Sequence, residues 1–227
     1  MFSIEPFEGF ALQSNDGSQE TIAITTTCSL HKIPYKKYQD FRQIPALFVP
    51  SGNVDYCQNI LNKVITPDYY PDFLKDYLYR KVYRTDSWSV GQRLFIKPAD
   101  KYKRFTGFIT NRGYKGKKHG PYWCSDVVKF ENEWRYYVAN GLVLSAEWYS
   151  GDEVNTPDAP ILNIRLPLTY CGALDFGMLS TGELALVESQ HPFACGWYGK
   201  DHIKYVEWLV QGWKYMLSIN HNQENKK

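Results

Sequence analysis

Two segments of the sequence can each fold back on themselves as a β-hairpin, and together they restrict the chain more than any other feature. In WRYYVANGLVLSAEWY, residues 134–149, aromatic and apolar runs flank an Asn140-Gly141 pair, which is typical of a two-residue hairpin turn. In LDFGMLSTGELALVESQ, residues 174–190, two similar runs flank Thr181-Gly182. These segments predict that the second half of the chain is rich in antiparallel sheet.

The remaining periodicities add helices and short strands to this pattern. Apolar residues spaced three and four apart predict helices over 51–64, 71–83 and 202–217. The short β-rich stretches are 21–27, 45–50 and 93–98. The predicted parts are a small N-terminal domain at 1–87, an antiparallel-rich domain at 88–220 and a frayed tail at 221–227. We therefore predict an α+β fold.

Composition narrows the cellular setting and the classes of partner. The 227 residues carry a formal net charge of +2, which is too small by itself to indicate a nucleic-acid or membrane partner. The five cysteines are widely spaced, and their odd number and lack of a C-x-x-C pair argue against a disulfide framework or a zinc site. The sequence has no signal-peptide pattern and no apolar run near the ~20 residues of a membrane span. We expect a cytoplasmic protein, and nothing in the sequence indicates an oligomeric state.

The second hairpin brings three oxygen-bearing side chains to one face. A two-residue loop at Thr181-Gly182 puts Asp175 directly opposite Glu188. Gln190 shares the face of Glu188 because side chains repeat every second residue. Opposed carboxylates repel each other, so we expect a divalent cation such as Mg²⁺, which takes oxygen ligands, to offset the cost. A hydrated, solvent-facing pair on an edge hairpin is the alternative.

A lysine and a basic loop precede the hairpins. Lys97 ends the apolar strand LFIKP, where a buried ammonium needs an anionic partner such as phosphate; otherwise it reaches out to solvent. Lys103 then stands before a Phe-Thr-Gly sequence, and a Gly-rich run with further lysines follows at 111–118. Such a loop either closes over polyphosphate through its backbone N–H groups or forms a solvated surface.

The first strand of the Asn-Gly hairpin has two different faces. Trp134, Tyr136 and Val138 form one face, which suits core packing. Glu133 and Arg135 lie on the other face and would border a groove. The alternative is a cross-strand or same-face salt bridge, worth about 0–1 kcal/mol if exposed.

The order of these motifs resembles the ATP-grasp superfamily. The strand lysine, Lys-x-Phe-Thr-Gly, the basic loop, SDVVKFENEWRYYVANG, then an aspartate on one strand and Glu-x-Gln on the next, follow one another along the chain. More narrowly, the sequence resembles a small bacterial and phage clade named for an arginine and two lysines. The resemblance runs from about residue 45 to GWYG at 196–199. It implies an ATP-grasp fold, whose antiparallel sheets hold nucleotide between them, preceded by a reduced N-terminal α/β part.

The resemblance also implies roles for individual residues. The implied nucleotide-binding residues are Lys97, Lys103, Asp126, Val127, Val128 and Glu133. Within this set, residues 126–128 fall at the hinge that holds adenine, and Glu133 falls where a carboxylate binds ribose. The implied catalytic residues are Arg135, Lys97 and Lys103, and the implied metal ligands are Asp175, Glu188 and Gln190.

The implied activity is ATP-dependent carboxylate–amine ligation through an acyl phosphate, with ATP and Mg²⁺ or Mn²⁺ as cofactors and small-molecule or peptide substrates. The sequence departs from the family at Gln190, where Asn is usual, and at Ala173, where many ligases carry arginine. Two alternatives follow: a nucleotide-binding module without ligation, or an ATP-dependent modifier of a peptide or nucleic acid. The Asp-Phe-Gly at 175–177 does not indicate a kinase, because no H-R-D loop or G-x-G-x-x-G accompanies it.

Overall fold

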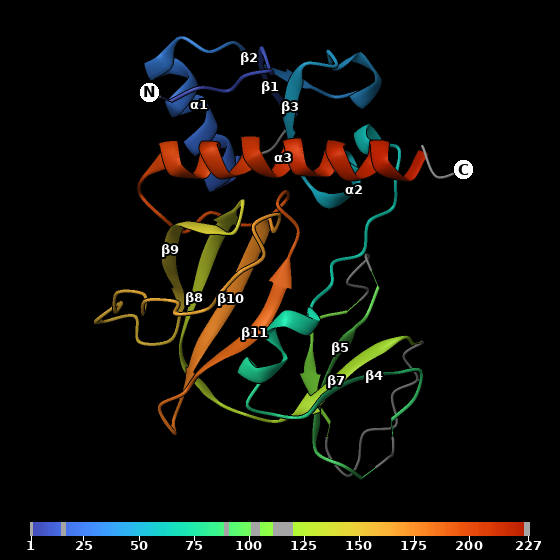
Figure 1. Cartoon of the computed structure of the whole chain (residues 1–227), viewed down its shortest axis with the longest axis vertical. Coiled ribbons are helices and arrows are strands. Elements are labelled where there is room, and N and C mark those ends of the chain that lie inside the picture. The colour runs from blue at the N-terminus through green and yellow to red at the C-terminus, as the bar shows by residue number, and fades with distance from the viewer. Residues whose placement is uncertain (1, 15–16, 89–90, 101–104, 111–119, 225–227) are drawn as a thin grey trace.

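The computed structural model describes residues 2–14, 17–88, 91–100, 105–110 and 120–224, and it has the predicted α+β character. In Figure 1 the long helix α3 crosses the middle of the molecule, with a small N-terminal unit on one side and two β-sheets on the other. The helices are α1 (Gln19–His31), α2 (Val54–Leu61) and α3 (His202–Glu224). The strands are β1 (Gly9–Gln13), β2 (Tyr35–Tyr38), β3 (Phe48–Ser51), β4 (Val82–Thr85), β5 (Leu94–Pro98), β6 (Phe108–Ile109), β7 (Tyr122–Asp126), β8 (Phe130–Ala139), β9 (Leu142–Ser150), β10 (Gly172–Leu179) and β11 (Leu184–Gln190).

The N-terminal unit is a three-stranded parallel sheet in the order β2-β1-β3. Because β1 is central, the chain leaves it through α1 toward β2 on one side and returns to β3 on the other. The carboxyl ends of β1 and β3 therefore lie together, next to the N-termini of α1 and α2. In open parallel sheets such a reversal of strand order creates a crevice at the carboxyl edge.

The predicted strand at 21–27 is wrong, because these residues belong to α1. Ser18 caps the helix by accepting a hydrogen bond from the Thr21 N–H, and the Thr25 hydroxyl bonds back to the carbonyl of Thr21. The β-branched residues favour a strand by propensity, but α1 packs against α3 with Ala23 and Ile24 fully buried. Tertiary packing overrides the local preference.

The other helix predictions have mixed outcomes. The helix at 51–64 is confirmed in its centre as α2, with Asn53 as its N-cap. The helix at 71–83 is wrong: a 3-10 turn at Asp72–Tyr77 ends before Tyr79, whose φ is 47°, and the chain then extends into β4. Pairing of β4 with β7 and burial of Leu74 replace the helix. At the C-terminus, α3 is confirmed and continues to Glu224, so the first part of the predicted frayed tail is helical.

Two antiparallel sheets follow the N-terminal unit, in the orders β4-β7-β5-β6 and β11-β10-β8-β9. The Asn-Gly hairpin is confirmed as β8 and β9, and both turn residues have positive φ, at 51° and 72°. The strand at 93–98 is confirmed as β5, and the end of the stretch at 45–50 is confirmed as β3. β4 lies before residue 88 but belongs to the first of these sheets, and the domain limits themselves stay a prediction.

The second hairpin has the predicted facing pair but a different turn. Asp175 lies opposite Glu188, as predicted. The loop, however, spans three residues. The Leu179 N–H donates to the Glu183 carbonyl, and the Gly182 N–H donates to the Leu179 carbonyl. Gly182 has a φ of 97°. A bulge at Val187 then restores the register, because Phe176 pairs with Leu186 rather than Val187. The two departures cancel at the site.

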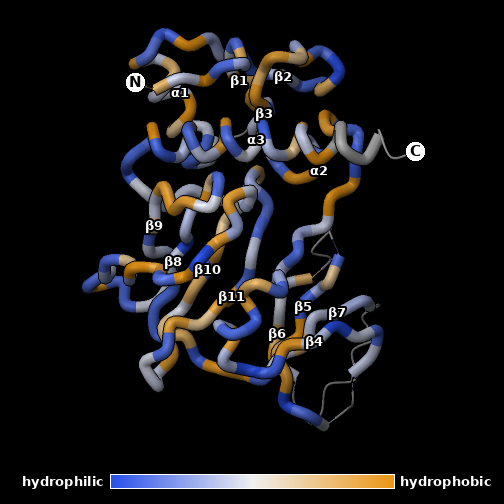
Figure 2. The backbone as a smooth tube through the Cα atoms, viewed as in Figure 1, coloured by the Kyte–Doolittle hydropathy of each residue, from blue (hydrophilic) through white to orange (hydrophobic). Residues whose placement is uncertain are grey.

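Hydrophobic side chains form three clusters. One lies between the N-terminal unit, α3 and the β8–β10 strands, with Trp208 and Trp213 among its buried residues. A second lies under the far face of the β8–β11 sheet, and a third, smaller one lies within the β4–β7 sheet. In Figure 2 hydrophilic and hydrophobic residues alternate along α3. Among the described residues no helix is long and apolar enough to cross a membrane.

Candidate active site

A row of charged side chains crosses one face of the β8–β11 sheet. Arg135 on β8 pairs with Asp175 on β10 and with Glu147 on β9, and Asp175 in turn pairs with Glu188 on β11. Directly paired residues have side chains on the same face. The row therefore places three carboxylates and one guanidinium side by side. The opposite face carries Trp134 and Tyr136, buried in the second core cluster as the sequence predicts.

Arg135 and Asp175 form a buried, two-pronged ion pair. The guanidinium donates from Nε and Nη2 to the two carboxylate oxygens, each at 2.7 Å, and the side chains are 10% and 3% exposed. Burial alone would lower the pKa of Arg135, but the hydrogen bonds and charge of Asp175 raise it above its ordinary value. The rings of Tyr149 and Tyr198 flank the guanidinium. The predicted alternative of a cross-strand salt bridge is therefore present, in a buried form that geometry strengthens.

Glu188, at the other end of the row, pairs with a lysine from the facing sheet. Lys97 Nζ donates to Glu188 Oε2 at 2.5 Å, and the two side chains are 12% and 19% exposed. The ammonium also lies 4.6 Å from the ring centres of both Tyr69 and Tyr70. Burial would lower the pKa of Lys97, but Glu188 and Tyr70 together raise it above its ordinary value. The alternative of a lysine extended into solvent is thus wrong.

Two basic side chains offset the repulsion between the facing carboxylates. Arg135 pairs with Asp175, and Lys97 pairs with Glu188. Asp175 is 2% exposed and the side chain of Glu188 is 19% exposed, so the alternative of a hydrated edge pair is wrong. The Gln190 amide contacts Glu188, so the three predicted metal ligands do lie together.

The chemistry of this trio fits Mg²⁺, because two carboxylates and an amide supply oxygen ligands and phosphate oxygens could complete the shell. Among the described residues no group of three or more His, Cys, Asp or Glu side chains could hold a metal. A metal here would therefore depend on Gln190 and the nucleotide, and the metal site stays a prediction.

A cavity of about 240 Å³ lies between the two antiparallel sheets and gathers most of the predicted nucleotide-binding residues. Its predicted members are Lys97, Asp126, Val127, Val128, Glu133 and Glu188. Its apolar walls come from both sheets and include Phe95, Ile109 and Phe130. Apolar walls with a few polar groups are typical of a small-molecule site.

A glycine allows the floor of this cavity to form. Gly177 on β10 lies under Phe130, and a Cβ at position 177 would come 2.3 Å from the Phe130 ring. A larger residue at position 177 would therefore displace the Phe130 side chain, which lines the cavity. Gly177, the glycine of the Asp-Phe-Gly sequence, thus has a packing role that is unrelated to kinases.

The structure adds Arg80 and Tyr70 to the predicted set, since both line the cavity. Arg80 donates to the carbonyl of Leu186 at 2.7 Å and to that of Val187 at 3.2 Å, so it ties the β4 side of the cavity to the β11 bulge. Burial lowers the pKa of Arg80. Sequence reasoning missed Arg80 because it stands in a segment with no motif, at the end of a wrongly predicted helix.

Glu133 borders the same cavity from β8. Tyr149 donates its hydroxyl to Glu133 Oε2 at 2.8 Å. Burial is the main cause that raises the pKa of Glu133, and the nearby Asp175 and Glu188 raise it further. Asp126, at the end of β7, has its carboxylate bonded to the Lys81 N–H. Both acidic groups line the cavity, and the ribose and adenine contacts that the resemblance implies stay predictions.

A second cavity, of about 330 Å³, adjoins the first and shares Phe95, Lys97 and Glu188 with it. It is also lined by Phe105, Thr106 and Gly107, which follow the predicted second lysine. Lys103 itself and the lysines at 115–118 lie outside the described residues. The Lys97–Glu188 pair thus stands between an apolar cavity and a cavity bordered by the Phe-Thr-Gly sequence.

The two antiparallel sheets and the cavity between them agree with the predicted ATP-grasp fold. The model of one family, the ATP-grasp domain of family 2 in the clade named for one arginine and two lysines, matches residues 77–208. The match covers more than half of the chain, and the chain belongs to this family. Both the predicted superfamily and the predicted clade are confirmed.

Several solved structures are similar to the chain at low sequence identity, and the first of those described below shares its fold. The ATP-grasp ligase PsnB, solved with a minimal precursor, is 9% identical, with 90% of this chain and 99% of that chain covered and a TM-score of 0.55. N5-carboxyaminoimidazole ribonucleotide synthetase from Thermotoga maritima is 13% identical, with 81% and 68% covered and a TM-score of 0.49. D-alanine–D-alanine ligase from Bacillus anthracis, solved with ATP, is 8% identical, with 95% and 99% covered and a TM-score of 0.43. A search of curated proteins finds no match.

Proposed function

We propose that the protein is an ATP- and Mg²⁺-dependent ligase that joins a carboxylate to an amine through an acyl phosphate. The observation that carries the proposal is the inter-sheet cavity, which gathers six residues implied by the family resemblance. Its apolar walls suit a purine, and Lys97 in its lining suits phosphate. PsnB, which shares the fold, is an ATP-grasp ligase by its name, and this agrees with the proposed class of reaction.

In the proposed reaction a substrate carboxylate oxygen attacks the γ-phosphorus of ATP, and the bond to the bridging oxygen breaks to release ADP. The amine nitrogen then attacks the acyl carbon, phosphate leaves, and the nitrogen loses a proton. The protein needs no nucleophile of its own for these steps. Its contribution is positioning and neutralisation of charge.

The paired charges suggest how the residues share this work. Lys97 would exchange its contact with Glu188 for a phosphate oxygen, and Glu188 would then be available to a metal ion together with Asp175 and Gln190. Bound Mg²⁺ would supply neutralisation of the phosphate charge. Arg135 would keep Asp175 in place, because its Nε and Nη2 both point to that carboxylate.

Binding of MgATP and formation of ADP test the proposal. We expect titration calorimetry to detect MgATP binding by the wild type, and Lys97→Met to weaken it at least about tenfold, the effect of losing a charged hydrogen bond. Lys75→Met is the matched control, because Lys75 is exposed and pairs with Asp72 outside the cavity lining. If wild type and Lys97→Met bind MgATP equally, the assignment of the cavity is wrong.

A panel of carboxylates and amines then separates ligation from the alternatives. ADP release that requires both substrates supports the ligase, whereas MgATP binding without turnover supports a nucleotide-binding module. Turnover that depends on a peptide or nucleic acid instead supports a macromolecule modifier; for nucleic acid, affinity should also fall steeply with salt. A cytoplasmic location is part of the proposal, supported by five cysteines that are all free and buried.

A further inference from the structure

A larger cavity, separate from the inter-sheet cavity, lies at the N-terminal unit. It has a volume of about 520 Å³ and opens at the carboxyl ends of β1 and β3, facing the segment 194–196 and the start of α3. No lining residue is shared with the inter-sheet cavity. None of the residues implied by the family resemblance borders it among the described part of the chain.

Two helices point their N-termini into this cavity. Ser18 caps α1, Asn53 caps α2, and both line the cavity wall. Helix N-termini carry partial positive charge and unpaired N–H groups, so they favour an anion. Gln13 at the end of β1 fixes the second helix start, because its side-chain oxygen accepts from the Asn53 N–H at 2.8 Å.

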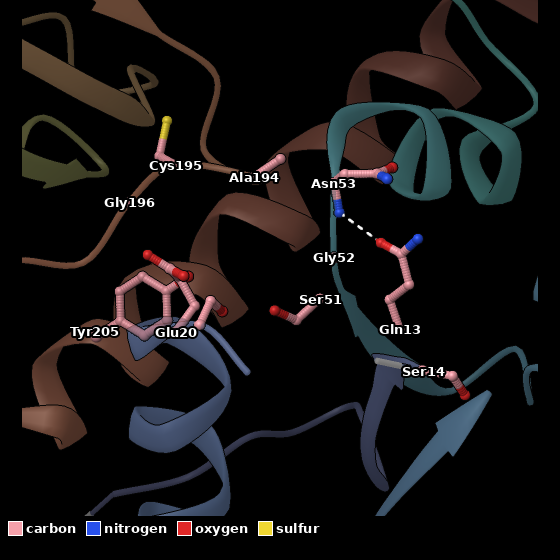
Figure 3. A pocket seen from close by; sticks show the side chains of 11 residues that line it. Gln13, Ser14, Glu20, Ser51, Gly52, Asn53, Ala194, Cys195, Gly196 and Tyr205 are labelled. Atoms are coloured by element: carbon pink, nitrogen blue, oxygen red, sulfur yellow. Dashed lines mark hydrogen bonds between the residues drawn. The ribbon is translucent and has the colours of Figure 1, made fainter. Parts of the chain in front are cut away.

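A buried hydroxyl between the two helix starts points to a ligand independently. Ser51 is 6% exposed, and Figure 3 shows its side chain directed into the open space between Asn53 on one side and Glu20 on the other. No hydrogen bond to this side chain is found among the described residues. Because this hydroxyl faces the cavity and makes no bond to a described residue, a group bound in the cavity can form one with it.

Glu20 adds a negative charge to the cavity, opposite in sign to the partial charge of the helix N-termini. It is the only formally charged residue among the described residues of the lining. One carboxylate oxygen accepts a hydrogen bond from the backbone N–H of Trp197 at 2.5 Å, and the second oxygen can accept one from a ligand cation. Tyr205, which lies beside Glu20 in Figure 3, has a hydroxyl whose pKa is raised, mainly by burial and also by the Glu20 charge. The neutral hydroxyl is thus available as a further donor.

The cavity adjoins the charged row of the candidate active site. Gly196 borders the cavity, and its carbonyl oxygen accepts from Arg135 Nη1 at 3.3 Å and from the Tyr137 hydroxyl at 2.5 Å. One backbone segment therefore separates the cavity from the guanidinium that holds Asp175. A molecule held here lies next to the proposed ligation site.

We infer that this cavity binds a free α-amino acid, with its carboxylate at the helix N-termini and Ser51 and its ammonium at Glu20. Such a molecule carries both charges that the lining can satisfy, a few ångströms apart. The identification of this amino acid as one of the two ligase substrates rests on the proposed function. Binding itself does not, because it involves neither ATP nor metal.

Binding of the standard L-amino acids to the full chain, without ATP, tests the inference. We expect at least one of them to raise the melting temperature of the wild type. By calorimetry its decarboxylated amine and its deaminated acid should each bind about tenfold more weakly or worse, since each lacks one charged contact. If no amino acid binds, or if either analogue binds as well as the amino acid, the inference is wrong.

Two variants locate the binding site. Ser51→Ala and Glu20→Gln should each weaken binding of the amino acid about tenfold. A glutamine at position 20 can still accept the hydrogen bond from the backbone N–H of Trp197, so this variant should keep the fold. Ser29→Ala is the control, because Ser29 is on the exposed face of the same helix α1. Unchanged affinity in both test variants would overturn the site. Amino-acid binding in a protein that does not bind MgATP would uphold the cavity and reject the ligase.

Discussion

The inter-sheet site and the N-terminal cavity differ in whether their polar side chains are paired within the protein. In the inter-sheet site the charged groups are paired with one another, Arg135 with Asp175 and Lys97 with Glu188. In the N-terminal cavity the hydroxyl of Ser51 faces the cavity and has no partner among the described residues. In the inter-sheet site the charges already satisfy one another, so a ligand must replace existing contacts. The N-terminal cavity leaves bonding capacity that a ligand would fill.

The largest expected effect comes from breaking the buried pair of the inter-sheet site. Asp175→Asn leaves the Arg135 charge buried without its partner, and we expect a loss of about 3–5 kcal/mol in the free energy of unfolding, measured by urea denaturation. Asp40→Asn is the control, because the exposed Arg42–Asp40 pair has the same 2.7 Å separation and should contribute little.

A double variant sharpens this prediction. Replacing Arg135 by Met and Asp175 by Leu removes both charges, so most of the lost stability should return while MgATP binding does not. If Asp175→Asn unfolds at the same urea concentration as the wild type, the buried pair is not what holds the sheet face together.

A smaller loss is expected at the other end of the charged row. Lys97→Met leaves Glu188, whose side chain is 19% exposed, without its ammonium partner. We expect about 1–3 kcal/mol of destabilisation by urea denaturation, less than for Asp175→Asn because Glu188 keeps some contact with water. Equal losses in the two variants would contradict the difference in burial between the two carboxylates.

The third prediction concerns pH. Burial raises the pKa of Glu133 in the folded state, so the folded protein binds this proton more tightly than the unfolded chain, whose Glu titrates near about 4.3. The contribution of Glu133 to the free energy of unfolding is therefore fully present below the pKa of the unfolded chain, and it is lost as pH rises through the pKa of the folded state.

Glu133→Gln removes this dependence and can still accept the Tyr149 hydroxyl bond. The variant should match the wild type near pH ~4 and be more stable at pH ~7, by less than about 1 kcal/mol. Melting temperatures across this pH range provide the measurement. A wild type that is more stable than the variant at neutral pH would show that the ionised carboxylate is instead favourable to the fold.

The smallest expected change is at the N-terminal cavity. Ser51→Ala removes a hydroxyl that makes no hydrogen bond among the described residues, so the melting temperature should stay the same or rise slightly. This result would contrast with both charge variants of the inter-sheet site. A clear loss of stability would mean that the Ser51 hydroxyl already has a partner in the free protein.

The sequence by itself determined the hairpins, the closing helix and the family. Side-chain alternation and turn residues are local properties, so the Asn140-Gly141 hairpin and the facing of Asp175 and Glu188 could be read from the chain. The second hairpin still reached the predicted pairing by another route, since a three-residue loop and the Val187 bulge offset each other.

Only the tertiary structure decided which groups meet across elements. The segment 21–27 became a helix because α3 covers it, and 71–83 became a turn and a strand because β7 pairs with it. The partners of the carboxylates, Arg135 and Lys97, and the entry of Arg80 into the cavity depend on how two sheets face each other.

The N-terminal cavity depends on the tertiary structure in the same way. Ser51 and Glu20 are far apart in the chain and come to one cavity because β3 pairs with β1, the strand that precedes α1; the segment 194–196 and α3 complete the lining. Local sequence encodes periodicity and turns, whereas such long-range contacts arise only when distant segments bury common surface.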